Sequence, residues 1–120
     1  QTPLITIGLE IHLKLSSESK IFCRCKNDQT LEHNQPNTNI VGVYLTTGAL
    51  PQLSAEVVEK GLLIGKALNC HFNTCSHFDR KSYFYPDLPM GYQITQLYRP
   101  INVDGQVAFF LDNYEQEKKI

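Results

Sequence analysis

The sequence predicts an α+β fold, with a mostly antiparallel sheet and one packed helix. Apolar and polar residues alternate along several segments that turn-forming residues separate, which is typical of antiparallel strands. One segment, residues 54–68, instead carries its apolar residues at helical spacing. The length of 120 residues corresponds to a single domain, so these elements are expected to share one fold.

The clearest strand pattern covers residues 4–15. From position 6 onwards its even positions are polar or glycine and its odd positions are apolar, so we expect a long strand with one buried face. Serines and a glutamate at 16–19 then turn the chain into a short strand at 20–25. The apolar positions are Ile5, Ile7, Leu9, Ile11, Leu13 and Leu15.

A loop and a strand precede the helix. Residues 26–39 are polar and include Asn, Asp, Thr and one Pro, which is typical of a surface loop. Residues 40–46 (IVGVYLT) are rich in β-branched and aromatic side chains and predict a strand. The sequence GALP at 48–51 follows as a turn.

Residues 54–68 form the predicted helix. Ser54 is placed to cap its first turn, and Glu56 suits the positive end of the helix dipole. Gly61 and Gly65 lie on the apolar stripe, where each costs about 1 kcal/mol relative to alanine. We therefore expect the helix backbone to approach a sheet closely on this face.

Strands and turns alternate after the helix. We expect extended chain at 77–85, a loop with two prolines at 86–91 and a further strand at 93–101. The sequence NVDG at 102–105 indicates a hairpin turn, from which a strand returns at 107–111.

Composition narrows the class of protein. With 42 % hydrophobic and 19 % charged residues, the chain is neither disordered nor fibrous. Eleven basic and twelve acidic residues give a net charge of −1, which argues against nucleic-acid binding through bulk charge. No apolar run approaches the roughly 20 residues of a membrane helix, and four cysteines are too few for a disulfide scaffold. We therefore expect no membrane contact and a reducing compartment. Because the sequence starts at Gln1 and not at a methionine, we also expect a fragment of a longer chain.

Glu10 and His12 are the first candidate site residues. Residues two apart on a strand point to one face about 6.5–7 Å apart, close enough for both side chains to reach one metal ion. Lys14 continues the row. The alternative is that these polar groups are the solvent-facing side of a half-exposed sheet.

Cys23 and Cys25 would supply half of a zinc site, which needs four ligands, usually in two close pairs. No second pair is evident from the spacing, so ordinary thiols are favoured over a complete zinc site. The remaining cysteines and histidines are scattered: His33, Cys70, His71, Cys75 and His77.

A third group of polar residues follows the helix. On a strand at 77–85, Asp79, Lys81, Tyr83 and Tyr85 share one face. Such groups are costly to bury unless they pair or line a polar passage. The alternative, equally supported, is an aromatic strand that packs its rings while its charged groups reach solvent.

Four segments carry a more specific pattern. The longest is FDRKSYFYPDLPMGYQITQ at 78–96, and IGLEIHLKL at 7–15, GALP at 48–51 and ALNC at 67–70 accompany it in order. Together they resemble the B subunits of tRNA-dependent amidotransferases over nearly the whole chain. The resemblance implies that residues 1–120 are the amino-terminal part of the family's cradle-shaped, kinase-like catalytic domain, without its later tRNA-binding domains.

The resemblance also implies an ATP- and Mg²⁺-dependent carbon–nitrogen ligase of translation, with glutamine as nitrogen donor. The family phosphorylates the side-chain carboxylate of Glu-tRNA(Gln) or Asp-tRNA(Asn), and ammonia from a glutaminase partner, the A subunit, displaces the phosphate. Glu10 and His12 match its metal-site positions, and Lys81 and Tyr83 match residues that line its ammonia tunnel. A small C subunit and misacylated tRNA, bound through later domains, are the other implied partners. The implied location is the bacterial cytoplasm or an organelle matrix or stroma.

Two features depart from the family pattern. Many members carry a C-x-C and a later C-x-x-C zinc knuckle, but here the second pair falls on Val41 and Tyr44, so a structural zinc is not expected. The remaining metal ligands are expected beyond Ile120, so the fragment alone should be inactive. The alternative function is a non-catalytic assembly module that docks the glutaminase and shapes the tunnel.

Overall fold

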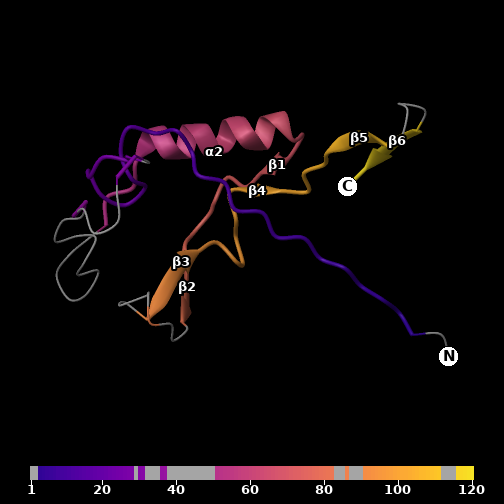
Figure 1. Cartoon of the computed structure of the whole chain (residues 1–120), viewed down its shortest axis with the longest axis horizontal. Helices are drawn as coiled ribbons and strands as arrows, with labels where there is room; N and C mark the ends of the chain where they lie inside the picture. The colour runs from indigo at the N-terminus through magenta and orange to yellow at the C-terminus, as the bar shows by residue number, and fades with distance from the viewer. Residues whose placement is uncertain are drawn as a thin grey trace.

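A computed structural model of the chain describes residues 3–28, 30–31, 36–37, 51–82, 86, 91–111 and 116–120. Within these residues it has one α-helix and six short β-strands (Figure 1). No helix in this part of the chain is both long and apolar enough to cross a membrane. The elements are α2 (Ala55–Ala67), β1 (His71–Phe72), β2 (Asp79–Ser82), β3 (Tyr92–Thr95), β4 (Asn102–Val103), β5 (Ala108–Leu111) and β6 (Gln116–Lys119).

Helix α2 begins and ends with recognisable caps. The Ser54 hydroxyl accepts a hydrogen bond from the Val57 N–H, with 3.4 Å between oxygen and nitrogen. At the other end Asn69 has a φ of 55°, and the Cys70 N–H donates to the Gly65 carbonyl at 2.8 Å. This is a Schellman-type ending in which an asparagine takes the left-handed position. The predicted helix is therefore confirmed.

The helix packs on β1 and β4. Asn102, in β4, donates from Nδ2 to the Gly61 carbonyl at 2.9 Å. Its amide also occupies the space that a side chain at Gly65 would need, and Gly65 is buried. The predicted close approach of helix and sheet is confirmed at Gly65, where the partner is a polar amide.

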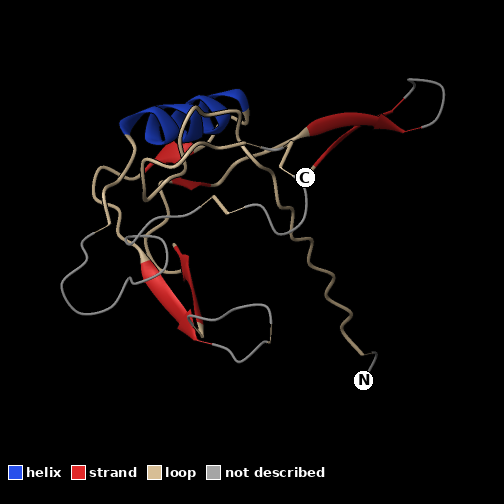
Figure 2. Cartoon of the chain, turned by 60° about the vertical axis from the view of Figure 1, so that its left-hand side comes forward, coloured by secondary structure: helices blue, strands red, loops and turns tan. Residues whose placement is uncertain are grey.

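The strands form three separate two-stranded antiparallel sheets, β1–β4, β2–β3 and β5–β6. Figure 2 shows β1–β4 beneath the helix, with the other two pairs extending away from it. The predicted α+β class with antiparallel pairing and one packed helix is confirmed. The expected continuous sheet is instead divided among these three pairs.

The region after the helix differs from the prediction in its strand limits. The strand expected at 93–101 ends at Thr95. Beyond it, the Leu97 and Tyr98 N–H groups donate to the carboxylate of Asp79 and not to a neighbouring strand. The return strand after the NVDG turn is β5, and it pairs with β6 rather than with the strand before the turn.

Two strands expected before the helix also need correction or lie beyond the described residues. The segment 20–25 is an irregular loop, closed by one isolated bridge between Ser19 and Lys26. The strand predicted at 40–46 lies outside the described residues.

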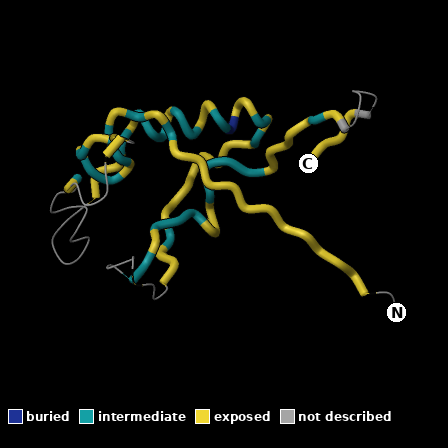
Figure 3. The backbone as a smooth tube through the Cα atoms, viewed as in Figure 1, coloured by how far each residue is buried: buried dark blue, intermediate teal, exposed yellow. Residues whose placement is uncertain are grey.

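Residues 4–15 do not form the strand that their alternation predicts. The large apolar side chains from Leu4 to Leu13 are between 74 % and 93 % exposed. Figures 1 and 3 show this segment as an exposed trace that runs away from the helix. Alternation determines which side chains share a face, but a strand also needs the backbone of a neighbour, and no described residue supplies one to this segment.

Apolar burial is low throughout the described residues, where no hydrophobic side chain is fully buried. The radius of gyration is 18.2 Å, whereas a compact chain of this length would have about 14 Å. The clearest aromatic contact joins Phe22 and Phe78, whose ring centres lie 5.1 Å apart, edge to face. Hydrogen bonds therefore determine much of the local geometry of the candidate sites.

Candidate functional site

The β2–β3 hairpin carries part of the third candidate group. Its register pairs Lys81 with Gln93, and Asp79 and Lys81 share one face as predicted. Arg80 lies on the other face, where its guanidinium is 4.9 Å from the centre of the Tyr92 ring. The structure thus separates the Asp79–Lys81 face from a cation–π face.

The Lys81 side chain is exposed and forms no hydrogen bond or ion pair with another described residue. Its ammonium can therefore reach a ligand on that face without first leaving a protein partner. Tyr83 and Tyr85, predicted for the same face, lie outside the described residues. The polar passage predicted there stays a prediction.

Asp79 has a role that the sequence did not reveal. Its Oδ2 accepts hydrogen bonds from the Leu97 N–H at 2.9 Å and the Tyr98 N–H at 3.2 Å. Its Oδ1 lies 3.5 Å from Nε2 of His77. Because the two backbone donors are 18 and 19 residues away in the chain, no local pattern could have identified them.

Glu10 and His12 lie on the exposed segment 4–15. Neither forms a hydrogen bond or ion pair within the part of the chain that the structure describes. No group of three or more His, Cys, Asp and Glu side chains among the described residues could hold a metal ion. The described residues bring no further ligands to this pair, so the predicted metal site stays a prediction.

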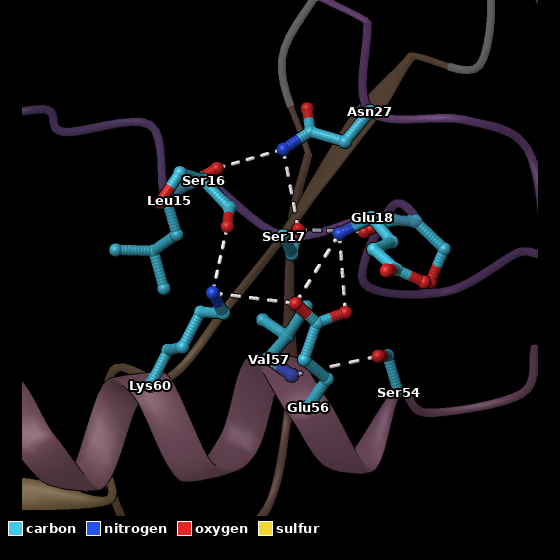
Figure 4. Close-up of polar contacts among 10 residues, drawn as sticks. Leu15, Ser16, Ser17, Glu18, Asn27, Ser54, Glu56, Val57 and Lys60 are labelled. Atoms are coloured by element: carbon cyan, nitrogen blue, oxygen red, sulfur yellow. Dashed lines mark hydrogen bonds and ion pairs between the residues drawn. The ribbon is translucent and has the colours of Figure 1, made fainter.

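The chain directly after this segment is tied to the start of α2 (Figure 4). The Glu18 N–H donates to both carboxylate oxygens of Glu56, at 3.2 and 3.1 Å. The Lys60 ammonium lies 3.3 Å from the same carboxylate and donates to the Ser16 carbonyl at 2.7 Å. These bonds fix the end of the segment that carries the two candidate metal ligands relative to the helix.

The loop that follows lines an open polar cavity of about 890 Å³. In it, Asp28 accepts hydrogen bonds from the Thr30 hydroxyl at 2.7 Å and the Thr30 N–H at 2.9 Å, and these hold the pKa of the carboxyl below its usual range. The cavity carries both signs of charge, so it favours neither an anion nor a cation. Its lining is Ser16, Ser17, Glu18, Ser19, Arg24, Lys26, Asn27 and Asp28.

Cys23 and Cys25 are half-buried, and neither forms a disulfide bond. Desolvation raises the pKa of the Cys25 thiol, the hydrogen bond and charge of Cys23 raise it further, and Lys20 opposes them. Among the described residues, the other cysteines and histidines do not join them in a metal-binding group: Cys70, His71, Cys75 and His77. His33 lies outside the described residues, as do Val41 and Tyr44, which replace the second cysteine pair of the family.

Comparison with known proteins finds similarity along nearly the whole chain. Residues 5–120 match the family model described as the GatB/GatE catalytic domain. The chain is 47 % identical over 113 residues to the B subunit of the aspartyl/glutamyl-tRNA(Asn/Gln) amidotransferase from Clostridium botulinum strain Hall, covering 93 % of this chain and 23 % of that relative. It is 52 % identical over 102 residues to the equally named protein from Symbiobacterium thermophilum, covering 84 % and 20 %. The chain therefore spans less than a quarter of the length of these relatives.

Proposed function

The chain belongs to the GatB/GatE catalytic-domain family, and on this premise we propose that it is the amino-terminal part of the catalytic B subunit of a tRNA-dependent amidotransferase. The observation that carries the proposal is the family match over residues 5–120, which includes the specific run at 78–96. The names of the similar proteins, which specify both aspartyl- and glutamyl-tRNA, support the substrate class.

The proposed reaction has two steps. A carboxylate oxygen of the misacylated residue attacks the γ-phosphorus of ATP, and the bond to the bridging oxygen breaks to release ADP. Ammonia then attacks the carbonyl carbon of the acyl phosphate, phosphate leaves with the C–O electron pair, and the nitrogen loses a proton. The substrates are Glu-tRNA(Gln), Asp-tRNA(Asn) or both. Enzymes accelerate such phosphoryl transfer mainly by positioning the reactants and neutralising phosphate charge.

Glu10 and His12 are the residues of this chain that would hold Mg²⁺. A carboxylate is a ligand that Mg²⁺ prefers, whereas imidazole is less usual for it, and an octahedral ion needs more than these two groups. Since no described residues complete a ligand group around them, the proposal requires further ligands from outside the described residues. When bound, the ion would neutralise charge on the ATP phosphates.

The proposed partners are a glutaminase (the A subunit), a small C subunit and misacylated tRNA bound through later domains. Lys81 and Tyr83 are proposed to line the passage that brings ammonia from the glutaminase. The exposed position of Lys81 on the polar face of β2 supports this role, because a free ammonium can exchange hydrogen bonds with a passing ligand. The proposed location is the bacterial cytoplasm or an organelle matrix or stroma.

A non-catalytic assembly module that docks the glutaminase and shapes the tunnel is the second candidate function. The incomplete set of metal donors around Glu10 and His12 among the described residues favours it.

Reconstitution of the full-length chain with the glutaminase and the small C subunit separates the two candidates. With misacylated tRNA, glutamine and ATP, the catalytic proposal expects ATP hydrolysis that depends on this chain and formation of Gln-tRNA or Asn-tRNA. If the chain is instead a non-catalytic assembly module, we expect it to bind the glutaminase, and ATP hydrolysis should be unchanged when this chain is omitted.

A further inference from the structure

Asp79 is the first residue of β2, and its side chain binds the loop between β3 and β4. One of its carboxylate oxygens accepts both backbone hydrogen bonds, from Leu97 at 2.9 Å and from Tyr98 at 3.2 Å. Hydrogen bonds to an ionised acceptor are about twice as strong as those between neutral groups. The Asp79 side chain is only 19 % exposed, so these bonds are partly shielded from water.

The loop that Asp79 holds depends on hydrogen bonds rather than on apolar packing. Leu97 and Tyr98 are 69 % and 77 % exposed, so burial of their side chains stabilises the loop little. Four further hydrogen bonds among the described residues join the loop to the chain before β2. The His77 N–H donates to the Arg99 carbonyl at 3.3 Å, and the Asn73 N–H donates to the Ile101 carbonyl at 3.0 Å. The Asn73 side-chain amide, at 2.6 Å, and the Ser76 hydroxyl, at 3.4 Å, both donate to the Pro100 carbonyl.

The same carboxylate lies two residues before Lys81, on the same face of β2. Strand β2 has four residues and, among the described residues, one neighbouring strand. An isolated two-stranded sheet is only marginally stable. The Asp79 bonds add a fixed point at the first residue of β2. They therefore help to hold Lys81 opposite Gln93.

We propose that Asp79 is a positioning residue for Lys81: by anchoring β2 to the backbone of residues 97 and 98, it sets where the Lys81 ammonium stands in the ammonia passage. This inference rests on the role proposed above for Lys81. Asp79 touches neither ammonia nor phosphate and acts only through the strand. Without its carboxylate, two backbone N–H groups lose their acceptor and β2 is held less firmly against the loop.

The test uses the full-length chain assembled with its partner subunits, with either glutamine or ammonium chloride as nitrogen source. Asp79→Ala removes the acceptor of both backbone hydrogen bonds. We expect glutamine-dependent amidation to fall about tenfold while ammonia-dependent amidation changes less than about twofold. Asp79→Asn keeps one carbonyl oxygen and a similar shape, so it should retain more of the glutamine-dependent rate. If Asp79→Ala does not fold, the two amidation rates of Asp79→Asn test the proposal instead.

Asp104→Asn is the matched control. Asp104 has a φ of 55°, which asparagine tolerates, and its carboxylate has no hydrogen-bond partner within the described part of the chain. This variant should leave both amidation rates unchanged. Hydrogen–deuterium exchange at residues 96–99 should rise in Asp79→Ala and stay at the wild-type level in Asp104→Asn.

The ratio of the two amidation rates decides the outcome. If Asp79→Ala lowers both rates in the same proportion, its role is only structural and the proposal is overturned. If Lys81→Met lowers the glutamine-dependent rate but Asp79→Ala leaves the ratio unchanged, the positioning inference fails while the proposed function stands. If Lys81→Met also leaves the ratio unchanged, the passage itself is wrong and the inference fails with it.

Discussion

The side-chain amide of Asn102 lies against Gly65 and donates a hydrogen bond to the carbonyl of Gly61, which joins β4 to helix α2. This contact explains why residue 65, on the apolar stripe of the helix, is a glycine. Gly65 leaves room for the amide, and Gly61 supplies its acceptor. Within the described residues Oδ1 of Asn102 is buried without a hydrogen-bond partner, so its Nδ2 donor and its packing hold the amide in place.

The two glycines should therefore respond in opposite ways to alanine. In Gly65→Ala the new methyl group meets the Asn102 amide, which must move, and we expect a loss of about 1–3 kcal/mol. Gly61→Ala is the matched control, because no atom lies within 4 Å of the added methyl group, and helix propensity should stabilise it by up to about 1 kcal/mol. Hydrogen exchange of the α2 amides in the full-length protein measures both effects. Equal protection in the two variants would contradict the assigned contact.

Thr30 should control the titration of Asp28. Thr30→Val removes the hydroxyl hydrogen bond and keeps the backbone N–H, so the pKa of the Asp28 carboxyl should rise toward its usual range. Because the folded pKa is lowered, these bonds stabilise the turn fully above the pKa of the unfolded carboxyl. Their contribution is lost as the pH falls through the folded pKa. NMR titration of the Asp28 carboxyl carbon checks the shift, and the same pKa in both proteins would show that the hydroxyl is not its cause.

The purified protein should contain much less than stoichiometric zinc. Val41 and Tyr44 stand where many members of the family carry a second pair of cysteines, and neither side chain supplies a thiol. Elemental analysis of wild type and Cys23→Ser measures the metal directly. One zinc per chain that disappears in the variant would show that other side chains complete the site, with Cys70, Cys75 or a histidine as the candidates.

Local signals explain which parts of the fold could be predicted from the sequence. The helix follows from Ser54 and from a stripe at 3.6-residue spacing, both of which lie within one segment. The alternation over 4–15 identifies a shared face but not a pairing partner, and pairing is a property of distant segments. The strand expected at 93–101 ends early for the same reason, since the acceptor of its later N–H groups is a distant carboxylate.

In the candidate site, too, the features that depend on nearby residues could be predicted and those that depend on distant residues could not. The shared face of Asp79 and Lys81 could be predicted because a strand alternates its side chains. The anchoring bonds of Asp79 could not, because they join residues 18 and 19 positions apart. For Glu10 and His12, spacing and family resemblance predict a site whose other ligands no described residue provides.

Lys81→Met should separate ammonia transfer from phosphoryl transfer. The substitution keeps the length and apolar volume of the side chain but removes its charge, so packing should change little. We expect the assembled enzyme to lose glutamine-dependent amidation, to keep hydrolysing ATP with misacylated tRNA, and to regain amidation in part with added ammonia. Lys119→Met, at an exposed lysine of β6, is the control and should behave as wild type.

Two other results would change the assignment of Lys81. Glutamine-dependent turnover within a few-fold of wild type would mean that the ammonium interacts only with solvent. Loss of amidation with both nitrogen sources, together with loss of ATP hydrolysis, would assign Lys81 to the phosphoryl-transfer site instead.

The most direct test of the central claim, that this chain supplies part of the catalytic metal site, is amide formation by His12→Ala in the full-length complex. We predict that ATP-dependent amidation is abolished while glutamine hydrolysis by the glutaminase continues. The melting temperature should hardly change, because His12 is exposed and has no partner among the described residues. His71→Ala, at an exposed histidine of β1, is the control and should retain full amidation. An equal yield of amide from His12→Ala and wild type would contradict the claim.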